Sequence, residues 1–205
     1  MLMNLSVRVD EAGLQGRVGR EVAEAVALQV RHFATGICEP GLETALEASL
    51  RVIRAGHAGD LPLFAATLGL PALQFRGLLR PECRNLAPDL PDALLARWLP
   101  AHFEALVALL WEHRGGDQAA IRCLARAIAA ACFGERHLWQ DMGFGMRGEL
   151  SALVAQCFPR LHARNTMDLK WKRLLFTLLG ERLGMPGLLP PACPRCASFQ
   201  ACFPE

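Results

Sequence analysis

Apolar residues recur at helical spacing through most of this 205-residue chain, and this periodicity is the strongest constraint on its fold. The clearest stretch lies near the C-terminus, where one helix face carries Trp171, Leu174, Leu175, Leu178, Leu179 and Leu183. No segment alternates apolar and polar residues for long enough to predict a strand. The sequence therefore predicts an all-α protein, with a single helical domain over residues 1–185 and an irregular, cysteine-containing tail over residues 186–205.

Prolines and capping residues divide the helical pattern into segments. Pro100 predicts a break inside the apolar stretch 93–114, because proline lacks a backbone donor and disrupts a helix interior. Asp117 is predicted to cap the following helix, and Asn165 with Asp168 resembles the capping pair of the last one. The predicted helical or apolar segments are, in chain order, 15–33, 42–54, 61–68, a segment after Pro71, 93–114, 117–132, 149–157 and 165–183.

Composition excludes several classes of protein. A hydrophobic content of 52% is enough to build a buried core, and a formal charge of +2 lacks the basic excess of a nucleic-acid binder. No uninterrupted apolar run reaches the roughly 18 residues that a membrane-spanning helix needs. The first residues carry Arg8, Asp10 and Glu11 and lack the apolar centre of a signal peptide. These features predict a cytoplasmic protein that binds neither membranes nor nucleic acid and whose thiols stay reduced.

Three thiols fall within ten positions of the tail, at Cys193, Cys196 and Cys202, among several prolines. Prolines oppose helix formation, so the thiols are expected on a loop. Thiolates bind zinc ions and iron–sulfur clusters. The spacing alone leaves three alternatives open: an iron–sulfur centre, a zinc site with a remote fourth ligand, or a redox-active dithiol.

The remaining cysteines are weaker indicators of a site. Free cysteine behaves as a small buried hydrophobe, and this interpretation suits Cys38, Cys83, Cys123 and Cys157. Cys132 also lies on an apolar helix face. It precedes His137 by five residues at a helix end, so either side chain can supply a further metal ligand.

The second half of the sequence resembles the NifQ family. The resemblance rests on motifs in the family's order: Ala131-Cys132, His137-Leu138-Trp139-Gln140-Asp141, Glu149-Leu150-Ser151, Phe158-Pro159, Ala163-Arg164-Asn165, Lys170-Trp171-Lys172 and Cys193-x-x-Cys196-x5-Cys202-Phe203. A fainter match at Leu68-Gly69-Leu70-Pro71 with Phe75 extends it towards residue 60.

This resemblance implies an iron–sulfur protein of nitrogen fixation that carries molybdenum together with iron and sulfide. Its partners would be the proteins that assemble the iron–molybdenum cofactor of nitrogenase. Cys193, Cys196 and Cys202 would bind iron, and molybdenum would need ligands from outside the tail, with Cys132 and His137 as candidates. The family tail usually reads Cys-x4-Cys-x-x-Cys-x5-Cys. Its first cysteine falls at Leu188 here, so the tail supplies three thiols.

Two further groups of residues belong to the expected site: a partner that orients the ring of His137, and basic residues that attract an anion. A metal-binding histidine normally has its second ring nitrogen held by a partner, and Asp141 is four residues away. His162 is a weaker candidate ligand. Lys170 and Lys172 are the two lysines of the chain, and with Arg173 they can attract molybdate, an oxyanion.

Each of these roles has a structural alternative. The basic residues can form a solvated helix face on which Asp168 pairs with Lys172 at i, i+4, and Trp139 and Trp171 are predicted to anchor packing. No nucleophile elbow, phosphate-binding loop or carboxylate pair points to turnover chemistry. The leading hypothesis, implied by the resemblance to the NifQ family, is a metallocluster carrier. A zinc-stabilised helical interaction module is the alternative, and a dithiol oxidoreductase is the third.

Overall fold

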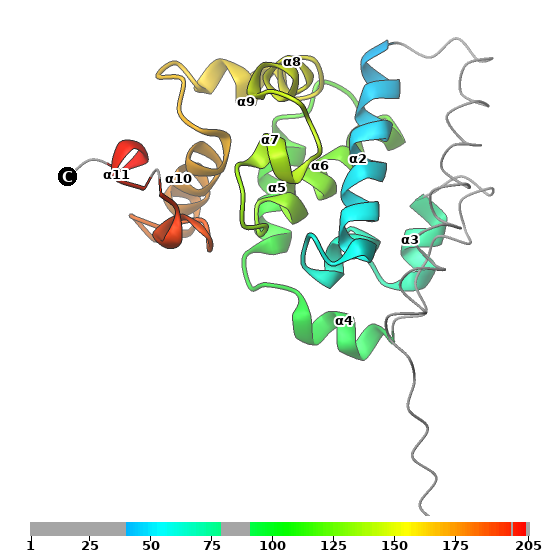
Figure 1. Cartoon of the computed structure of the whole chain (residues 1–205). Helices are drawn as coiled ribbons and strands as arrows, with labels where there is room; N and C mark the ends of the chain where they lie inside the picture. Colours follow the sequence, from blue (N-terminus) through cyan, green and yellow to red (C-terminus); the bar gives the residue numbers. More distant parts are fainter. Residues whose placement is uncertain (1–39, 79–90, 198, 204–205) are drawn as a thin grey trace, which may run out of the picture.

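The computed structural model describes residues 40–78, 91–197 and 199–203, and within these ranges it contains helices and no strand (Figure 1). The predicted all-α class is therefore confirmed, while the helix predicted at 15–33 lies outside the described residues. The elements are α2 (Pro40–Ala58), η1 (Leu63–Thr67), α3 (Ala72–Leu78), α4 (Asp92–Trp98), α5 (Phe103–Glu112), α6 (Ala119–Ala131), α7 (Leu138–Asp141), α8 (Arg147–Cys157), α9 (Pro159–Arg164), α10 (Trp171–Leu183), η3 (Cys193–Arg195) and α11 (Phe199–Cys202). None of the described helices is both long and apolar enough to span a bilayer.

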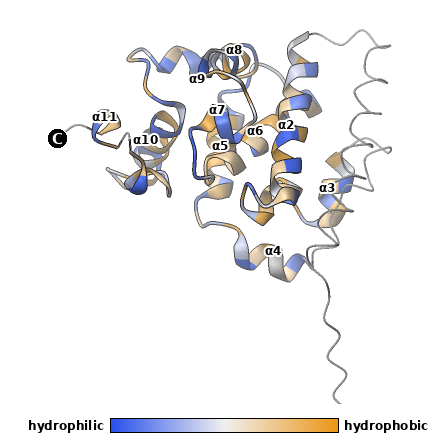
Figure 2. Ribbon diagram, viewed as in Figure 1, coloured by the Kyte–Doolittle hydropathy of each residue, from blue (hydrophilic) through white to orange (hydrophobic). Residues whose placement is uncertain are grey.

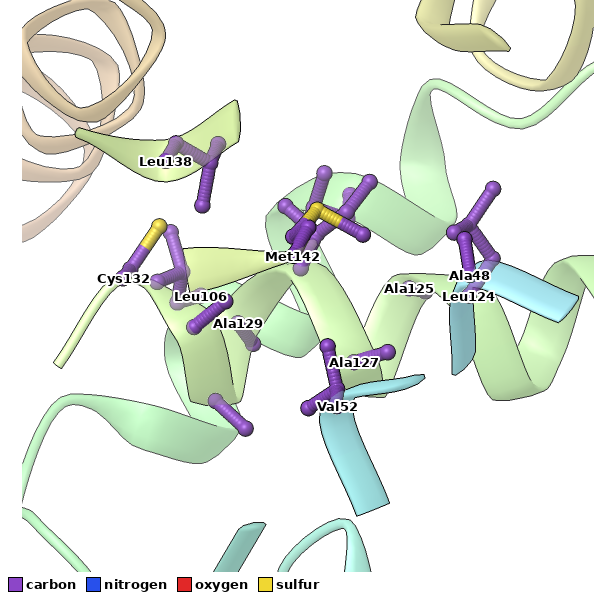
Figure 3. Packing of buried hydrophobic residues seen from close by; sticks show 14 of the residues in the cluster. Ala48, Val52, Leu106, Leu124, Ala125, Ala127, Ala129, Cys132, Leu138 and Met142 are labelled. Carbon is purple, nitrogen blue, oxygen red and sulfur yellow. The ribbon is translucent and has the colours of Figure 1, made fainter. Parts of the chain in front are cut away.

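Helix α6 lies at the centre of the fold and packs against α2, α5 and η1. Its residues from Cys123 to Ala131 are buried, and most of them are alanines whose small side chains allow neighbouring helices to approach closely. Figure 3 shows this contact, with Val52 of α2 near Ala127 of α6. The apolar residues of α5 and α6 gather at the middle of the molecule, while polar residues alternate along α2 (Figure 2).

The break predicted at Pro100 is present. Helix α4 ends at Trp98 and α5 begins at Phe103, whose N–H donates to the carbonyl of Pro100 at 3.0 Å. Phe103 is fully buried and packs edge-on against Phe64 of η1, with ring centroids 5.4 Å apart. The break therefore turns the chain so that α5 can enter the core.

Two predicted helix starts are wrong, because local side-chain hydrogen bonds compete with the helix. Asp117 does not cap α6, since its carboxylate accepts a hydrogen bond from Arg114 and the N-cap residue is Gln118. Helix α10 begins at Trp171 and not at Asn165. The amide of Asn165 closes a loop by bonding both the N–H and the carbonyl of Leu169, and Asp168 inside that loop has a left-handed φ of 48°.

A buried arginine holds the turn after η1 against the core. Arg126 on α6 is 8% exposed, and its guanidinium donates to the carbonyls of Leu68 and Gly69 and to the carboxylate of Glu104. Gly69 has a φ of 68°, and a side chain at this position would collide with Phe103. Arg126 therefore satisfies backbone carbonyls that the turn leaves without a helical partner.

We predict that Arg126→Met lowers the free energy of unfolding by about 3 kcal/mol, because it leaves buried carbonyls without donors. Urea unfolding followed by circular dichroism measures the change. Arg122→Met is the matched control: Arg122 is an exposed arginine on the same helix, and its loss should cost less than about 1 kcal/mol. Equal losses in the two variants would contradict the assigned role.

Candidate metal centre

The three tail thiols line one pocket, which lies between the tail, the N-terminus of α10 and the segment that joins α6 to α7. In Figure 1 the tail elements η3 and α11 lie beside α10. Each of the three segments contributes basic or sulfur-containing side chains. The residues that line the pocket are Glu135, Arg136, His137, Leu138, Trp139, Arg147, Lys170, Trp171, Lys172, Arg173, Ala192, Cys193, Cys196, Phe199, Cys202 and Phe203.

Short turns, and not a fully irregular loop, present the thiols. Cys193 opens the 3-10 turn η3 and Cys202 ends the single-turn helix α11, while Cys196 between them is extended. Pro194 fits the start of η3 because its missing N–H is not needed there. The tail prolines thus limit helix length without preventing turns, and all three thiols are half-buried.

An ion pair and a cation–π contact help to hold the cysteine-containing part of the tail on the helical body. Arg195 donates to Glu135 at 2.8 Å, which links η3 to the segment after α6. The guanidinium of Arg173 lies 5.0 Å from the ring centroid of Phe203, and that ring stacks on Phe199. Arg173, predicted as an oxyanion-binding residue, therefore also packs against the tail.

Lys172 and Asp141 form a buried ion pair at the pocket wall. The Lys172 ammonium donates to Asp141 Oδ2 at 2.7 Å and to the carbonyl of Gly134 at 2.8 Å. The two side chains are 7% and 0% exposed. The alternative of a solvated face with an Asp168–Lys172 pair is therefore wrong, since Asp168 pairs with Arg147 instead.

The Asp141 carboxylate has further donors besides Lys172. It accepts hydrogen bonds from the backbone N–H of Arg136 and from Arg136 Nε, at 3.2 Å and 3.1 Å. These bonds use the carboxylate that the sequence offered as a partner for His137. Asp141 therefore ties the segment before α7 to α10, and it fixes two walls of the pocket relative to each other.

Gly134 is required by this arrangement. A Cβ atom at residue 134 would lie 2.5 Å from Asp141 Oδ2 and 2.6 Å from Leu61 Cδ2, both of which are buried. We predict that Gly134→Ala costs about 1–3 kcal/mol of stability, as overpacking in a core does. Thermal unfolding measures it against Gly148→Ala, a helical position with no atom within 4 Å of an added Cβ. A Gly134 variant as stable as the Gly148 variant would contradict the packing.

Cys132 lies behind the pocket wall. It caps the C-terminus of α6 and is fully buried, and it is not among the described residues that line the pocket. Burial raises the pKa of the Cys132 thiol to about 12, and the nearby Cys193 also raises it. The Lys172 cation acts in the opposite direction and lowers this pKa. The structure thus brings Cys132 close to the tail site but keeps its thiol within the core.

His137 lines the pocket and is the N-cap residue of α7. It is half-buried, and its pKa is lowered chiefly by burial and further by the positive charges of Lys170 and Lys172. A lowered pKa favours the neutral imidazole, the form that binds metals. Unlike Cys132, His137 therefore faces the same space as the tail thiols.

We predict that Lys170→Gln raises the His137 pKa, because it removes one of the charges that oppose imidazole protonation. The measurement is an NMR titration of the imidazole ring, with the wild-type midpoint expected below about 6.5. For stability, the lowered pKa means that His137 contributes fully above that pH and that its contribution falls as the pH drops towards the folded-state pKa. An unchanged midpoint in Lys170→Gln would contradict the electrostatic contribution.

The other predicted residues fall into packing or surface roles. Trp171 is buried, with its indole N–H donating to Ser151 at 3.0 Å, and Trp139 packs partly buried against the core. His162 is exposed on α9, and its ring centroid lies 6.1 Å from that of Trp171. Cys123 and Cys157 are buried as predicted, whereas Cys38 and Cys83 lie outside the described residues.

Position 188, where the family pattern has its first cysteine, does not reach the pocket. Leu188 is half-buried and packs against the core, and its Cβ lies 3.2 Å from where a Cβ would stand on Gly180 of α10. Met185, at the turn before it, approaches the same glycine with its carbonyl oxygen. The leucine therefore fills an apolar contact beside α10.

Three thiols border the pocket, and thiolates bind both zinc ions and iron–sulfur clusters. Within residues 40–78, 91–197 and 199–203, no three His, Cys, Asp or Glu side chains are grouped closely enough to hold a metal ion. Cys193, Cys196 and Cys202, which share one pocket, are the residues that would hold a metal centre.

Sequence reasoning missed part of the pocket. Arg136 and Arg147 line it but come from segments with no metal-ligand pattern. The basic side chains outnumber the acidic ones, since five basic residues and Glu135 line the space. The pocket is therefore electropositive, which favours anionic occupants.

Comparison with known proteins identifies the family of the chain. The NifQ family model matches residues 46–204, most of the chain. Among curated relatives, protein NifQ of Azotobacter vinelandii is 35% identical over 62% of this chain and 63% of its own length. A NifQ homolog of Sinorhizobium fredii is 35% identical over 75% of this chain and 67% of its own length, and protein NifQ of Rhodobacter capsulatus is 30% identical over 83% and 94%.

The aligned part spans a little under two thirds of the Azotobacter relative. No solved structure matches the chain significantly. The family match reaches from α2 to the last tail cysteine and so includes every segment that forms the pocket. The chain therefore belongs to the NifQ family and is involved in nitrogen fixation.

Proposed function

We propose that this protein is an iron–sulfur carrier that holds molybdenum and donates it to the proteins that assemble the iron–molybdenum cofactor of nitrogenase. The observation that carries the proposal is the meeting of Cys193, Cys196 and Cys202 on one electropositive pocket. The protein would work in the cytoplasm, where thiols stay reduced and able to bind metal.

The two kinds of side chain in the pocket suit the two parts of such a cargo. Thiolates are the usual ligands of iron in clusters. Molybdate is an anion, and the exposed Lys170 and Arg136 offer it positive charge at the pocket. His137 is the non-tail candidate that lies on the pocket and can bind metal in its neutral form.

A carrier role, and not an enzymatic one, suits the same residues. Thiols and positive charge border the pocket, and these groups suit the binding of an anionic, iron-containing cargo. Release would require the tail to loosen from the body. One contact that holds the cysteine-containing part of the tail, Arg195 with Glu135, is exposed and of the modest strength expected for a surface ion pair.

Elemental analysis tests the proposal. The protein is purified without oxygen from cells supplied with molybdate, and its iron, molybdenum, zinc and acid-labile sulfide are measured per chain. We expect iron and sulfide in comparable amounts together with molybdenum. Stoichiometric zinc without sulfide would instead support a zinc-stabilised interaction module, and a metal-free dithiol would support redox chemistry at Cys193 and Cys196.

A further inference from the structure

The ammonium group of Lys172 has hydrogen-bonding capacity left on the pocket side. It donates to Asp141 Oδ2 and to the carbonyl of Gly134, and an ammonium group carries three N–H donors. Within the described residues the protein thus uses two of the three. Lys172 lines the pocket although its side chain is only 7% exposed, so bulk water has little access to its ammonium group.

This lysine differs from the other cations of the pocket because it is both buried and held in place. Lys170 is exposed, and Arg147 is engaged by Asp168 and the carbonyl of Leu169. The partner of Lys172 is itself fixed, since Asp141 also accepts two hydrogen bonds from Arg136. A cation fixed in this way needs no reorganisation when a ligand arrives, and its field is weakly screened in a low-dielectric site.

The cation also borders the same pocket as the tail thiols. Cys193 lines the pocket with it, whereas Cys132 lies behind the wall. Lys172 and Cys193 therefore border the same space.

We propose that Lys172 is a positioning residue for the cluster, which it contacts by donating its third N–H to a sulfur of Cys193 or of the cluster, and that Asp141 holds it there. This inference rests on the proposed function. Hydrogen bonds to sulfur and nearby charge are known determinants of cluster potential. Lys172 would thus stabilise the more negatively charged, reduced state of the cluster, while the exposed basic residues would act on incoming anions.

Redox titration of the reconstituted protein tests this role. The wild-type chain and its variants are loaded without oxygen with ferrous iron and sulfide, and the midpoint potential is followed by electron paramagnetic resonance. For Lys172→Met we expect reduction to become at least tenfold less favourable, a downward shift of about 59 mV for a one-electron couple. Asp141→Asn removes a negative charge and should shift the potential upwards.

The two variants should shift the midpoint potential in opposite directions. A general disturbance of the structure would not give shifts whose sign depends on the charge removed, so opposite shifts indicate an electrostatic effect. Arg122→Met, an exposed arginine on α6 away from the pocket, should leave the potential unchanged. If the single variants do not fold, the double variant Lys172→Met/Asp141→Leu is used, and it should shift the potential downwards by less, because both charges leave.

Potentials that do not move in loaded, folded variants would overturn the role of Lys172 and leave the proposed function intact. A wild-type chain that takes up no iron and sulfide would overturn both. Lys172→Arg supplies a further test, because it retains the charge and the donors. Its potential should lie closer to that of the wild type than the Lys172→Met value does, and the reverse order would contradict the proposal.

Discussion

Asp141→Asn lowers the free energy of unfolding by about 3–5 kcal/mol, because it leaves the Lys172 ammonium buried without its counter-charge. The Asp141 side chain is fully buried and receives donors from both Lys172 and Arg136, so no solvent compensates for the loss. Chemical unfolding followed by circular dichroism measures the effect, and it should appear in the protein without metal.

Two comparisons make this expectation specific. The double variant Asp141→Leu/Lys172→Met removes both charges and should recover most of the loss, because apolar replacements of a buried pair are often neutral or stabilising. Asp168→Asn breaks the ion pair between Asp168 and Arg147. Because the Asp168 side chain is 81% exposed, this change should lower the free energy of unfolding far less than Asp141→Asn does. A double variant no more stable than Asp141→Asn would show that the buried pair is not the source of the effect.

From the proposed function we predict that replacing Cys193, Cys196 and Cys202 together by Ala abolishes cluster binding. The three thiols are half-buried turn residues with no role in the hydrophobic core, so the helical body should remain folded. Iron and acid-labile sulfide after anaerobic loading measure the loss, which should exceed tenfold. Circular dichroism of the same sample checks that the helices persist.

A second cysteine variant serves as the control for this loss. Cys157→Ala removes a thiol that is buried at the end of α8, away from the pocket. It should lower stability, as core truncations do, but keep the cluster. Retention of the full cluster in the triple tail variant would place the ligands elsewhere, with Cys132 as the next residue to replace.

Local sequence signals predicted most of the described fold. The helix around residues 42–54, the break at Pro100 and the final apolar face from Trp171 to Leu183 all depend on spacing within one or two turns. The short helices α7 and α9, of four and six residues, were missed because such lengths do not establish a period. The start of α10 was placed too early, because the bonds of Asn165 to Leu169 compete with helix formation.

Those residues of the candidate metal centre that are close together in the sequence could be predicted. Contacts that form only when distant segments fold together could not. The three tail thiols and His137 were identified from residue type and spacing, and the structure places them on one pocket. The ion-pair partner of Lys172 was not predicted. Asp141 is 31 positions away in the sequence, whereas Asp168 offered a nearer carboxylate at helical spacing. The exclusion of Leu188 from the pocket likewise depends on its packing against Gly180, which no local pattern reveals.

The most direct test of the central claim is X-ray absorption at the molybdenum edge of the protein purified without oxygen. If the tail thiols hold a cluster that carries molybdenum, the spectrum will show sulfur atoms bound to molybdenum and iron atoms beyond them. The triple tail variant should lose this signal. Molybdenum surrounded by oxygen alone, or a protein that contains zinc and no molybdenum, would contradict the account.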